Sequence, residues 1–110
     1  MDNRDSLNDV VRRTMLYDFY AGMLTERQRE AYEMRYLQDM SLAETADELN
    51  ISRQAVNDLV KRTLAVLEEF EEKLGFIKEH ERRDNIIQKI KALPSSDGEI
   101  LLLLDEINRL

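Results

Sequence analysis

The fold is decided by residues 41–62, which read SLAETADELNISRQAVNDLVKR. Ser41 followed by Glu44 is the pattern of a capping box, in which the two side chains satisfy backbone amides in the first turn of a helix. Asn50 stands where that helix should end, because asparagine tolerates the left-handed conformation of a C-terminal turn. Ser52 then has the position of a second N-cap. The segment predicts two capped helices joined by a tight turn, which is the spacing of a helix-turn-helix.

Apolar residues of the same segment supply the expected contact between the two helices. Ala46 is small at the position where two steeply crossed helices should touch, so their backbones can approach. Ile51 and Val56 stand on either side of Ser52 at the spacing of a hydrophobic staple. We expect the wedge between these two helices and the helix before them to consist of Leu49, Ile51, Val56 and Leu59.

The second helix keeps its polar residues off this apolar face. Arginine pairs bidentately with guanine, and glutamine or asparagine with adenine, whereas Lys61 and Arg62 suit phosphates. The candidate DNA-binding residues are therefore Ser52, Arg53, Gln54, Asn57, Lys61 and Arg62. The same pattern also describes a helical corner in any all-α domain, and helix-turn-helix units also serve as protein-binding modules.

Helix signals continue on both sides of this unit. Apolar residues recur at helical spacing over residues 7–23, and a capping box at Thr25 and Gln28 opens a further helix to about Leu37. From Ser52 no helix breaker occurs before Gly75, which predicts one long helix over residues 52–74. Its heptad-like seam would consist of Val56, Val60, Thr63, Leu67, Phe70 and Leu74. The aromatic residues of the first two helices are expected in the core, and the glutamates of residues 68–72 on a solvated face.

The remainder reads as a C-terminal helical extension over residues 76–110. A polar amphipathic helix is expected up to Leu93, a break at residues 94–98, and a last helix capped by Ser96 with Glu99. Residues 100–104 are apolar around most of the helix circumference, and such a helix packs into its own domain or into a partner chain. We predict an all-α fold and a single domain over residues 1–110.

The composition narrows the class of protein. The chain has 110 residues, three glycines, one proline, no cysteine and a single histidine, His80. These counts leave few turns for a hairpin-rich sheet and remove disulfides, thiol catalysis, most zinc sites and the usual acid–base dyads. No glycine-rich phosphate loop or nucleophile elbow is present. We expect no enzyme activity, no cofactor and no metal, and a surface position for His80.

The sequence also bears on location. No apolar run approaches the roughly 20 residues of a membrane span, and residues 1–5 lack the features of a signal peptide. We therefore expect a cytoplasmic protein that has no membrane partner.

Charge is distributed unevenly along the chain. The net charge of −7 argues against a non-specific nucleic-acid coat. When the chain is divided after residues 24, 51 and 67, only residues 52–67 have a net positive charge, from Arg53, Lys61 and Arg62 against Asp58. The positive stretch thus coincides with the second helix of the predicted helix-turn-helix.

Residues 42–56 are similar to the C-terminal helix-turn-helix region of bacterial sigma factors. The wider block resembles the YlxM family, small bacterial helix-turn-helix proteins encoded beside signal recognition particle genes, over about residues 15–74. The matching segments, in order, are YDFY (17–20), LTERQ (24–28), KRT (61–63) and EEFEEKL (68–74). Asn57 departs from the family pattern, which has a tyrosine there.

The resemblance implies an all-helical, dimeric DNA-binding regulator of transcription, linked by gene neighbourhood to the signal recognition particle pathway. It implies a helix-turn-helix of the winged-helix-like superfamily without a wing. In a first hypothesis the chain binds duplex DNA as a symmetric homodimer, held by the long helix seam and the C-terminal helix. In a second, it is an acidic adaptor that binds a basic protein, such as a signal recognition particle component. Direct binding to the particle's RNA is less favoured, because only one short basic stretch exists.

Overall fold

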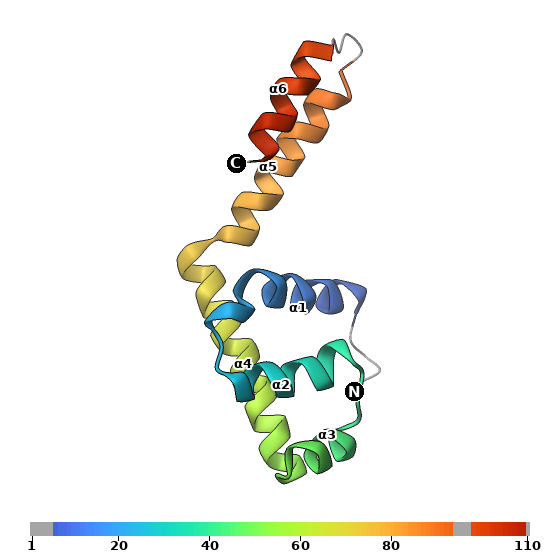
Figure 1. The fold of residues 1–110 in the computed structure, drawn as a ribbon, viewed down its shortest axis with the longest axis vertical. Helices are drawn as coiled ribbons and strands as arrows, with labels where there is room; N and C mark the ends of the chain where they lie inside the picture. The colour runs from blue at the N-terminus through green and yellow to red at the C-terminus, as the bar shows by residue number, and fades with distance from the viewer. Residues whose placement is uncertain (1–5, 94–97, 110) are drawn as a thin grey trace. The chain divides into compact units, whose positions relative to one another are not determined.

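The structure is a computed structural model that describes residues 6–93 and 98–109, without the side chains of Glu99 and Leu103. Every regular element in these ranges is helical (Figure 1), which confirms the predicted all-α class. The elements are α1 (Leu7–Tyr20), the 3-10 turn η1 (Ala21–Met23), α2 (Glu26–Tyr32), the π-helical turn η2 (Glu33–Leu37), α3 (Leu42–Leu49), α4 (Arg53–Leu74), α5 (Phe76–Lys91) and α6 (Gly98–Asn108). The predicted cap at Ser96 lies outside the described residues.

The chain divides into two compact units, residues 1–74 and residues 75–110. The first contains α1 to α4 and therefore the whole segment that predicts a helix-turn-helix. The second contains the hairpin of α5 and α6. The sequence predicted one domain over the full length, and each unit is described by itself below.

Capping side chains define the helix starts in the first unit. The Glu44 amide donates to Ser41 Oγ at 3.0 Å, and the Ser41 amide donates to Glu44 Oε1 at 3.1 Å, as a capping box requires. Thr25 and Gln28 make the same reciprocal pair. Asn50 ends α3 in the left-handed conformation, with φ 57°. These three predictions are confirmed.

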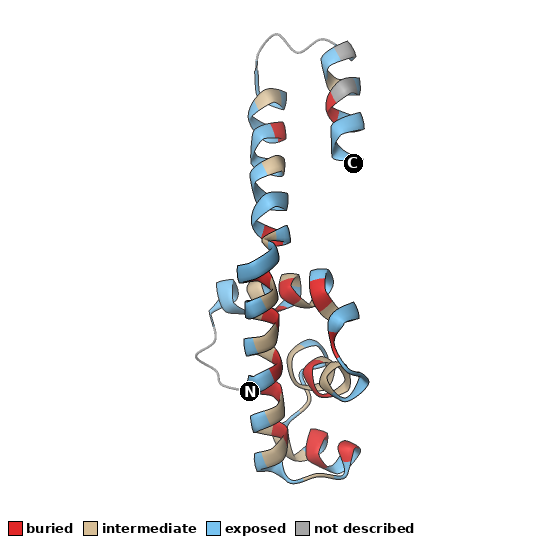
Figure 2. Ribbon diagram, turned by 90° about the vertical axis from the view of Figure 1, so that its left-hand side faces the viewer, coloured by how far each residue is buried: buried red, intermediate tan, exposed pale blue. Residues whose placement is uncertain are grey.

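The core of the first unit forms where α2, α3 and α4 meet (Figure 2). Its buried cluster consists of Ala31, Ala46, Leu49, Val56 and Val60, with Ile51 and Leu59 packed against it. The wedge predicted from residues 49–59 is therefore confirmed, and Ala46 of α3 belongs to the same buried cluster. Thr45 is also fully buried, and its hydroxyl is satisfied because it donates to the Ser41 carbonyl at 2.9 Å.

The buried stripe of α4 differs from the predicted seam at its C-terminal end. The buried residues are Val56, Val60, Thr63, Leu67 and Glu71, whereas Phe70 is half-buried and Leu74 is 45% exposed. The buried carboxylate of Glu71 is compensated by a hydrogen bond of 2.5 Å, which it accepts from the hydroxyl of the fully buried Tyr20. Helices α1, α2 and α3 of the same chain cover this stripe. The expectation that the seam joins two copies is thus wrong for its four buried residues, Val56, Val60, Thr63 and Leu67.

Two of the four glutamates expected on a solvated face instead fix α1 against α4. Glu68 accepts two hydrogen bonds from the Arg12 guanidinium, at 3.2 and 2.9 Å, and Glu71 accepts from Tyr20. Glu69 and Glu72 are exposed, as expected. The prediction failed at Glu71 and missed the partner of Glu68, whose side chain is 45% exposed, because a pattern of charges along one helix does not reveal polar groups on the helix that packs against it.

The aromatic residues form the contact between α1 and the α2–η2 segment. Tyr20 and Tyr32 are fully buried, and the ring of Tyr17 stacks on that of Tyr32 with centroids 5.3 Å apart. Burial, together with the hydrogen bond that Tyr17 donates to Glu33, raises the pKa of Tyr17 to about 12. The predicted core role is confirmed for Tyr20 and Tyr32, whereas Tyr17 is half-buried and Phe19 remains 38% exposed.

The second unit is a helical hairpin in which α5 and α6 lie side by side and run in opposite directions (Figure 1). Ile87 and Leu104 are buried, while several other large apolar side chains are exposed. His80 is exposed on α5, as predicted. No helix within residues 6–93 or 98–109 is long and apolar enough to cross a membrane.

Candidate nucleic-acid interface

Helix α3 packs beside the N-terminal turns of α4 and forms a helix-turn-helix with it (Figure 1). The turn is closed by backbone hydrogen bonds, since the Ile51 amide donates to the Ala46 carbonyl at 3.1 Å. At the start of α4, the Ala55 amide donates to Ser52 Oγ at 3.0 Å, which confirms Ser52 as the N-cap. Helix α2 also packs against α4. The first turns of α4 are thereby held in position by α2, α3 and the turn between α3 and α4.

The structure brings the six sequence-predicted residues together on the first three turns of α4. Five of them are exposed and Asn57 is half-buried; they are Ser52, Arg53, Gln54, Asn57, Lys61 and Arg62. Residues 53 to 62 span about 14 Å at 1.5 Å per residue, which is close to the roughly 12 Å width of the B-DNA major groove. The set is therefore compact enough to enter one groove together.

These side chains form two neighbouring stripes on the helix. Arg53, Asn57 and Lys61 follow each other at intervals of four residues, and so do Gln54 and Arg62 with Asp58 between them. Asp58 is exposed, so its carboxylate stands among the groups offered to a phosphate backbone. Ser52 keeps a hydroxyl proton to donate, although its oxygen already accepts the cap hydrogen bond.

Arg27 is a further basic residue at this site that the sequence reasoning missed. Its guanidinium donates to the Leu49 carbonyl at 3.4 Å, which places it at the turn between α3 and α4. The guanidinium nitrogen Nη1 of Arg27 also lies 3.9 Å from the carboxylate oxygen Oε2 of Glu30, and half of the Arg27 side chain remains exposed. In the sequence Arg27 stands 26 residues before Arg53, and only the packing of α2 brings it to the turn.

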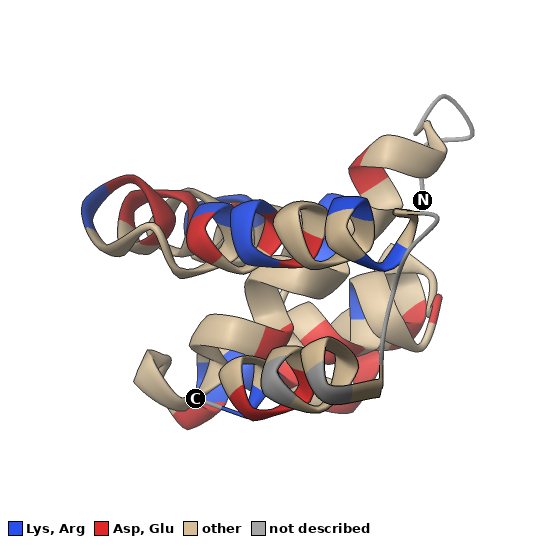
Figure 3. Cartoon of the chain, turned by 90° about the horizontal axis from the view of Figure 1, so that it is seen from above, with Lys and Arg blue, Asp and Glu red and all other residues tan. Residues whose placement is uncertain are grey.

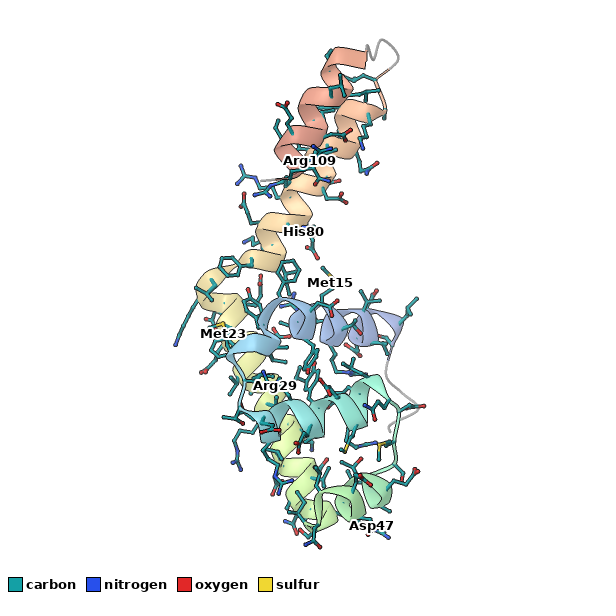
Figure 4. All side chains as sticks on the ribbon, in the orientation of Figure 1. Met15, Met23, Arg29, Asp47, His80 and Arg109 are labelled. Atoms are coloured by element: carbon teal, nitrogen blue, oxygen red, sulfur yellow. The ribbon has the colours of Figure 1, made fainter. Side chains whose placement is uncertain are left out.

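Acidic residues on α3 reduce the positive charge of the helix-turn-helix surface. Glu44, Asp47 and Glu48 are all exposed on this short helix, and Asp47 is labelled in Figure 4. Hydrogen bonds from the backbone and hydroxyl of Ser41 hold the pKa of Glu44 below its usual value. Basic and acidic segments both occur along the helices of the chain (Figure 3). Within the helix-turn-helix, the basic residues of the recognition surface therefore lie at the start of α4 and not on α3.

The described residues offer little for metal chemistry. Among residues 6–93 and 98–109, no three His, Asp or Glu side chains are grouped as metal ligands. The carboxylates of Glu68 and Glu71 serve as structural acceptors for Arg12 and Tyr20.

Residues 7–107 match the model of the UPF0122 family, which is described as "Putative helix-turn-helix protein, YlxM / p13 like". The chain belongs to this family. The UPF0122 protein of Thermoanaerobacter sp. (strain X514) is 46% identical over 108 residues, covering 93% of this chain and 92% of the relative. That of Halalkalibacterium halodurans is 42% identical over 107 residues, covering 94% and 98%. That of Symbiobacterium thermophilum is 47% identical over 92 residues, covering 83% and 86%.

The family match extends beyond the resemblance expected for residues 15–74. It includes most of α6 and therefore both compact units. The family is described by its helix-turn-helix and by no catalytic activity. Membership thus confirms the predicted family and fold class.

Proposed function

We propose that this chain binds duplex DNA through the N-terminal turns of α4 and acts as a regulator of transcription. In this proposal Arg53, Gln54 and Asn57 contact base edges in the major groove. Lys61 and Arg62 contact phosphates, and Arg27 adds a phosphate contact at the turn. Ser52 caps the helix and donates its hydroxyl proton to the backbone of the DNA.

The single observation that carries the proposal is the exposed gathering of these side chains on a capped, well-supported helix. All but Asn57 of the six candidates on α4 are exposed, and the wedge beneath them is buried. A helix held in this way presents its side chains to a groove without first having to fold. The net positive charge of residues 52–67 favours approach to phosphates, despite the negative charge of the whole chain.

Selection from fragmented genomic DNA tests the proposal. At about 50 mM salt, where phosphate contacts are strong, the wild-type chain should retain a small set of related sites. Lys61→Glu should abolish their enrichment. Lys73→Glu is the matched control, because Lys73 is exposed on the same helix but lies at its C-terminal end. Retained DNA no different from the input, or equal loss in both variants, would overturn the proposal.

A second candidate function is that of an acidic adaptor for a basic protein, such as a component of the signal recognition particle. The observation that favours it is the exposed acidic surface of α3, with Glu44, Asp47 and Glu48. Charge reversal at Arg53 and Lys61 would leave adaptor binding intact and abolish DNA binding. A polar substitution of Ile107 should impair the adaptor, whereas the side chain of Leu103, an equivalent sequence-based choice, lies outside the described residues.

A further inference from the structure

The hairpin of α5 and α6 leaves much of its apolar surface uncovered. Where the two helices pack, Ile87 and Leu104 are buried. In contrast, Ile86 is 49% exposed, Ile100 42% and Ile107 46%. Aliphatic side chains of this size are normally covered when they gather on one face.

These three exposed residues and the half-buried Ile90 lie on the same side of the hairpin. Each residue of a helix is turned by about 100° from the one before it. On α5, the direction of the buried Ile87 serves as the reference: Ile86 is rotated from it by about 100° and Ile90 by about 60°, both against the sense of the helical turn. On α6, the buried Leu104 is the reference: Ile100 is rotated from it by about 40° and Ile107 by about 60°, again against the sense of the helical turn. Because α5 and α6 run in opposite directions, these rotations bring both pairs to a single face, here called the isoleucine face.

The two outer edges of the hairpin carry opposite charges. Lys89 lies two residues beyond Ile87, and Glu106 two residues beyond Leu104, so each is turned by about 200° and points away from the other helix. Both are exposed. They cannot reach one another within one hairpin. Helix α5 carries five basic and three acidic residues, whereas α6 carries three acidic residues and no basic one.

We propose that the isoleucine face docks onto the same face of a second copy of this chain, with α5 of each copy on α6 of the other. The product is an antiparallel four-helix bundle with two-fold symmetry. This arrangement places Lys89 of one copy at the edge that carries Glu106 of the other. Stacking α5 on α5 would instead bring like charges together, so the charges select both the partner and its orientation.

The proposal deepens the proposed function, because a two-fold dimer presents two copies of α4 to DNA and so predicts a site with two related halves. It also narrows the dimer contact anticipated from the sequence, which combined the long-helix seam with the C-terminal helix, to the second unit. Four of the six seam residues of α4 are covered by their own chain, whereas Ile86, Ile100 and Ile107 of the isoleucine face are exposed.

The mass of the full-length chain in solution, without DNA, tests this directly by light scattering over a dilution series. The wild type should show twice the 13.0 kDa mass of the chain. Ile107→Gln should raise the dimer dissociation constant on the order of a hundredfold, since the side chain is lost twice in a symmetric interface. Leu102→Gln is the matched control. Leu102 is 68% exposed on the same helix but points away from the isoleucine face, so its dissociation constant should stay near the wild-type value.

A charge exchange tests the orientation and does not depend on the apolar core. Lys89→Glu and Glu106→Lys should each weaken the dimer by about tenfold, because each places two pairs of like charges at the edges. The double variant should restore wild-type association. Circular dichroism confirms that each variant keeps its helices.

Three results would overturn the proposal: a wild-type monomer at every concentration, equal effects of Ile107→Gln and Leu102→Gln, or no restoration in the double variant. A monomer that binds another protein through Ile107 would overturn it in favour of a different partner. DNA binding is measured separately. A dimer that retains no DNA refutes the proposed function alone, and a monomer that binds single half-sites refutes the dimer alone.

Discussion

The two compact units bury different shares of their apolar residues. The first has a central core, since the stripe of α4 is buried from Val56 to Leu67 by three other helices, although Leu7 and Val11 on α1 stay exposed. The second displays them, since Ile86, Ile100 and Ile107 remain exposed on a two-helix hairpin. A hairpin of two helices has only one internal contact line, whereas four helices can surround a core. The first unit therefore holds α4 in place with contacts from its own chain, whereas the second unit has an apolar surface that is suited to association.

The largest expected difference between the units is in the effect of a leucine truncation. Leu67→Ala should lower the free energy of unfolding by about 2–5 kcal/mol, because Leu67 is fully buried and a cavity results. Leu102→Ala, at a position 68% exposed, should change it by no more than about 0.5 kcal/mol. Urea unfolding of the three proteins measures both values. Equal losses would remove the distinction between the units.

A smaller effect is expected from the buried hydrogen bond that joins α1 to α4. Tyr20→Phe removes the hydroxyl that donates to the buried Glu71 at 2.5 Å, and should cost about 1–3 kcal/mol. Tyr17→Phe is the matched change on the same helix, and should cost less because the hydrogen bond of Tyr17 to Glu33 is only partly buried. The comparison uses chemical unfolding followed by circular dichroism. A larger loss in Tyr17→Phe would contradict the assigned role of Glu71.

Two left-handed residues allow a comparison of turns in the two units. Asn50 has φ 57° in the turn of the helix-turn-helix, and Gly75 has φ 65° before α5. Alanine is strained in this conformation by about 1–2 kcal/mol, so Asn50→Ala and Gly75→Ala should both destabilise the chain. Asn50→Gly should be close to neutral or stabilising, which thermal unfolding can establish. An Asn50→Ala chain as stable as the wild type would argue against the left-handed turn.

The smallest effect concerns the capping box of α3 and depends on pH. The folded-state pKa of Glu44 is lowered by Ser41, so its contribution to stability is present above the unfolded pKa and is lost as the pH falls through the folded pKa. The difference in unfolding free energy between the wild type and Glu44→Gln should therefore shrink on acidification. Unfolding measured from neutral to acidic pH tests this. A difference that is constant, or that grows in acid, would contradict it.

Local patterns in the sequence predicted the helix-turn-helix. They did not predict contacts between residues that are far apart in the sequence. The caps at Thr25, Ser41 and Ser52 depend on residues three positions apart, so the sequence alone reveals them. Glu71 escaped because its burial depends on Tyr20, which is 51 residues away. The position of a charged residue on a helix does not show which residues of another helix pack against it.

The candidate site was predictable to a similar extent. Its six residues on α4 follow one another along a single helix, and helical periodicity places them together. Arg27 reaches the same turn only through the packing of α2, which no local pattern encodes. A coarse division of charge also concealed the basic character of α5, because residues 68–110 together are acidic.

The salt dependence of DNA binding tests most directly the claim that the start of α4 contacts phosphates. With about three phosphates per half-site, the slope of log K against log salt should be near −5 for a dimer, and Lys61→Ala should reduce its magnitude by about 2. Lys73→Ala should leave the slope unchanged. A slope near zero, or the same slope in Lys61→Ala as in the wild type, would contradict the account.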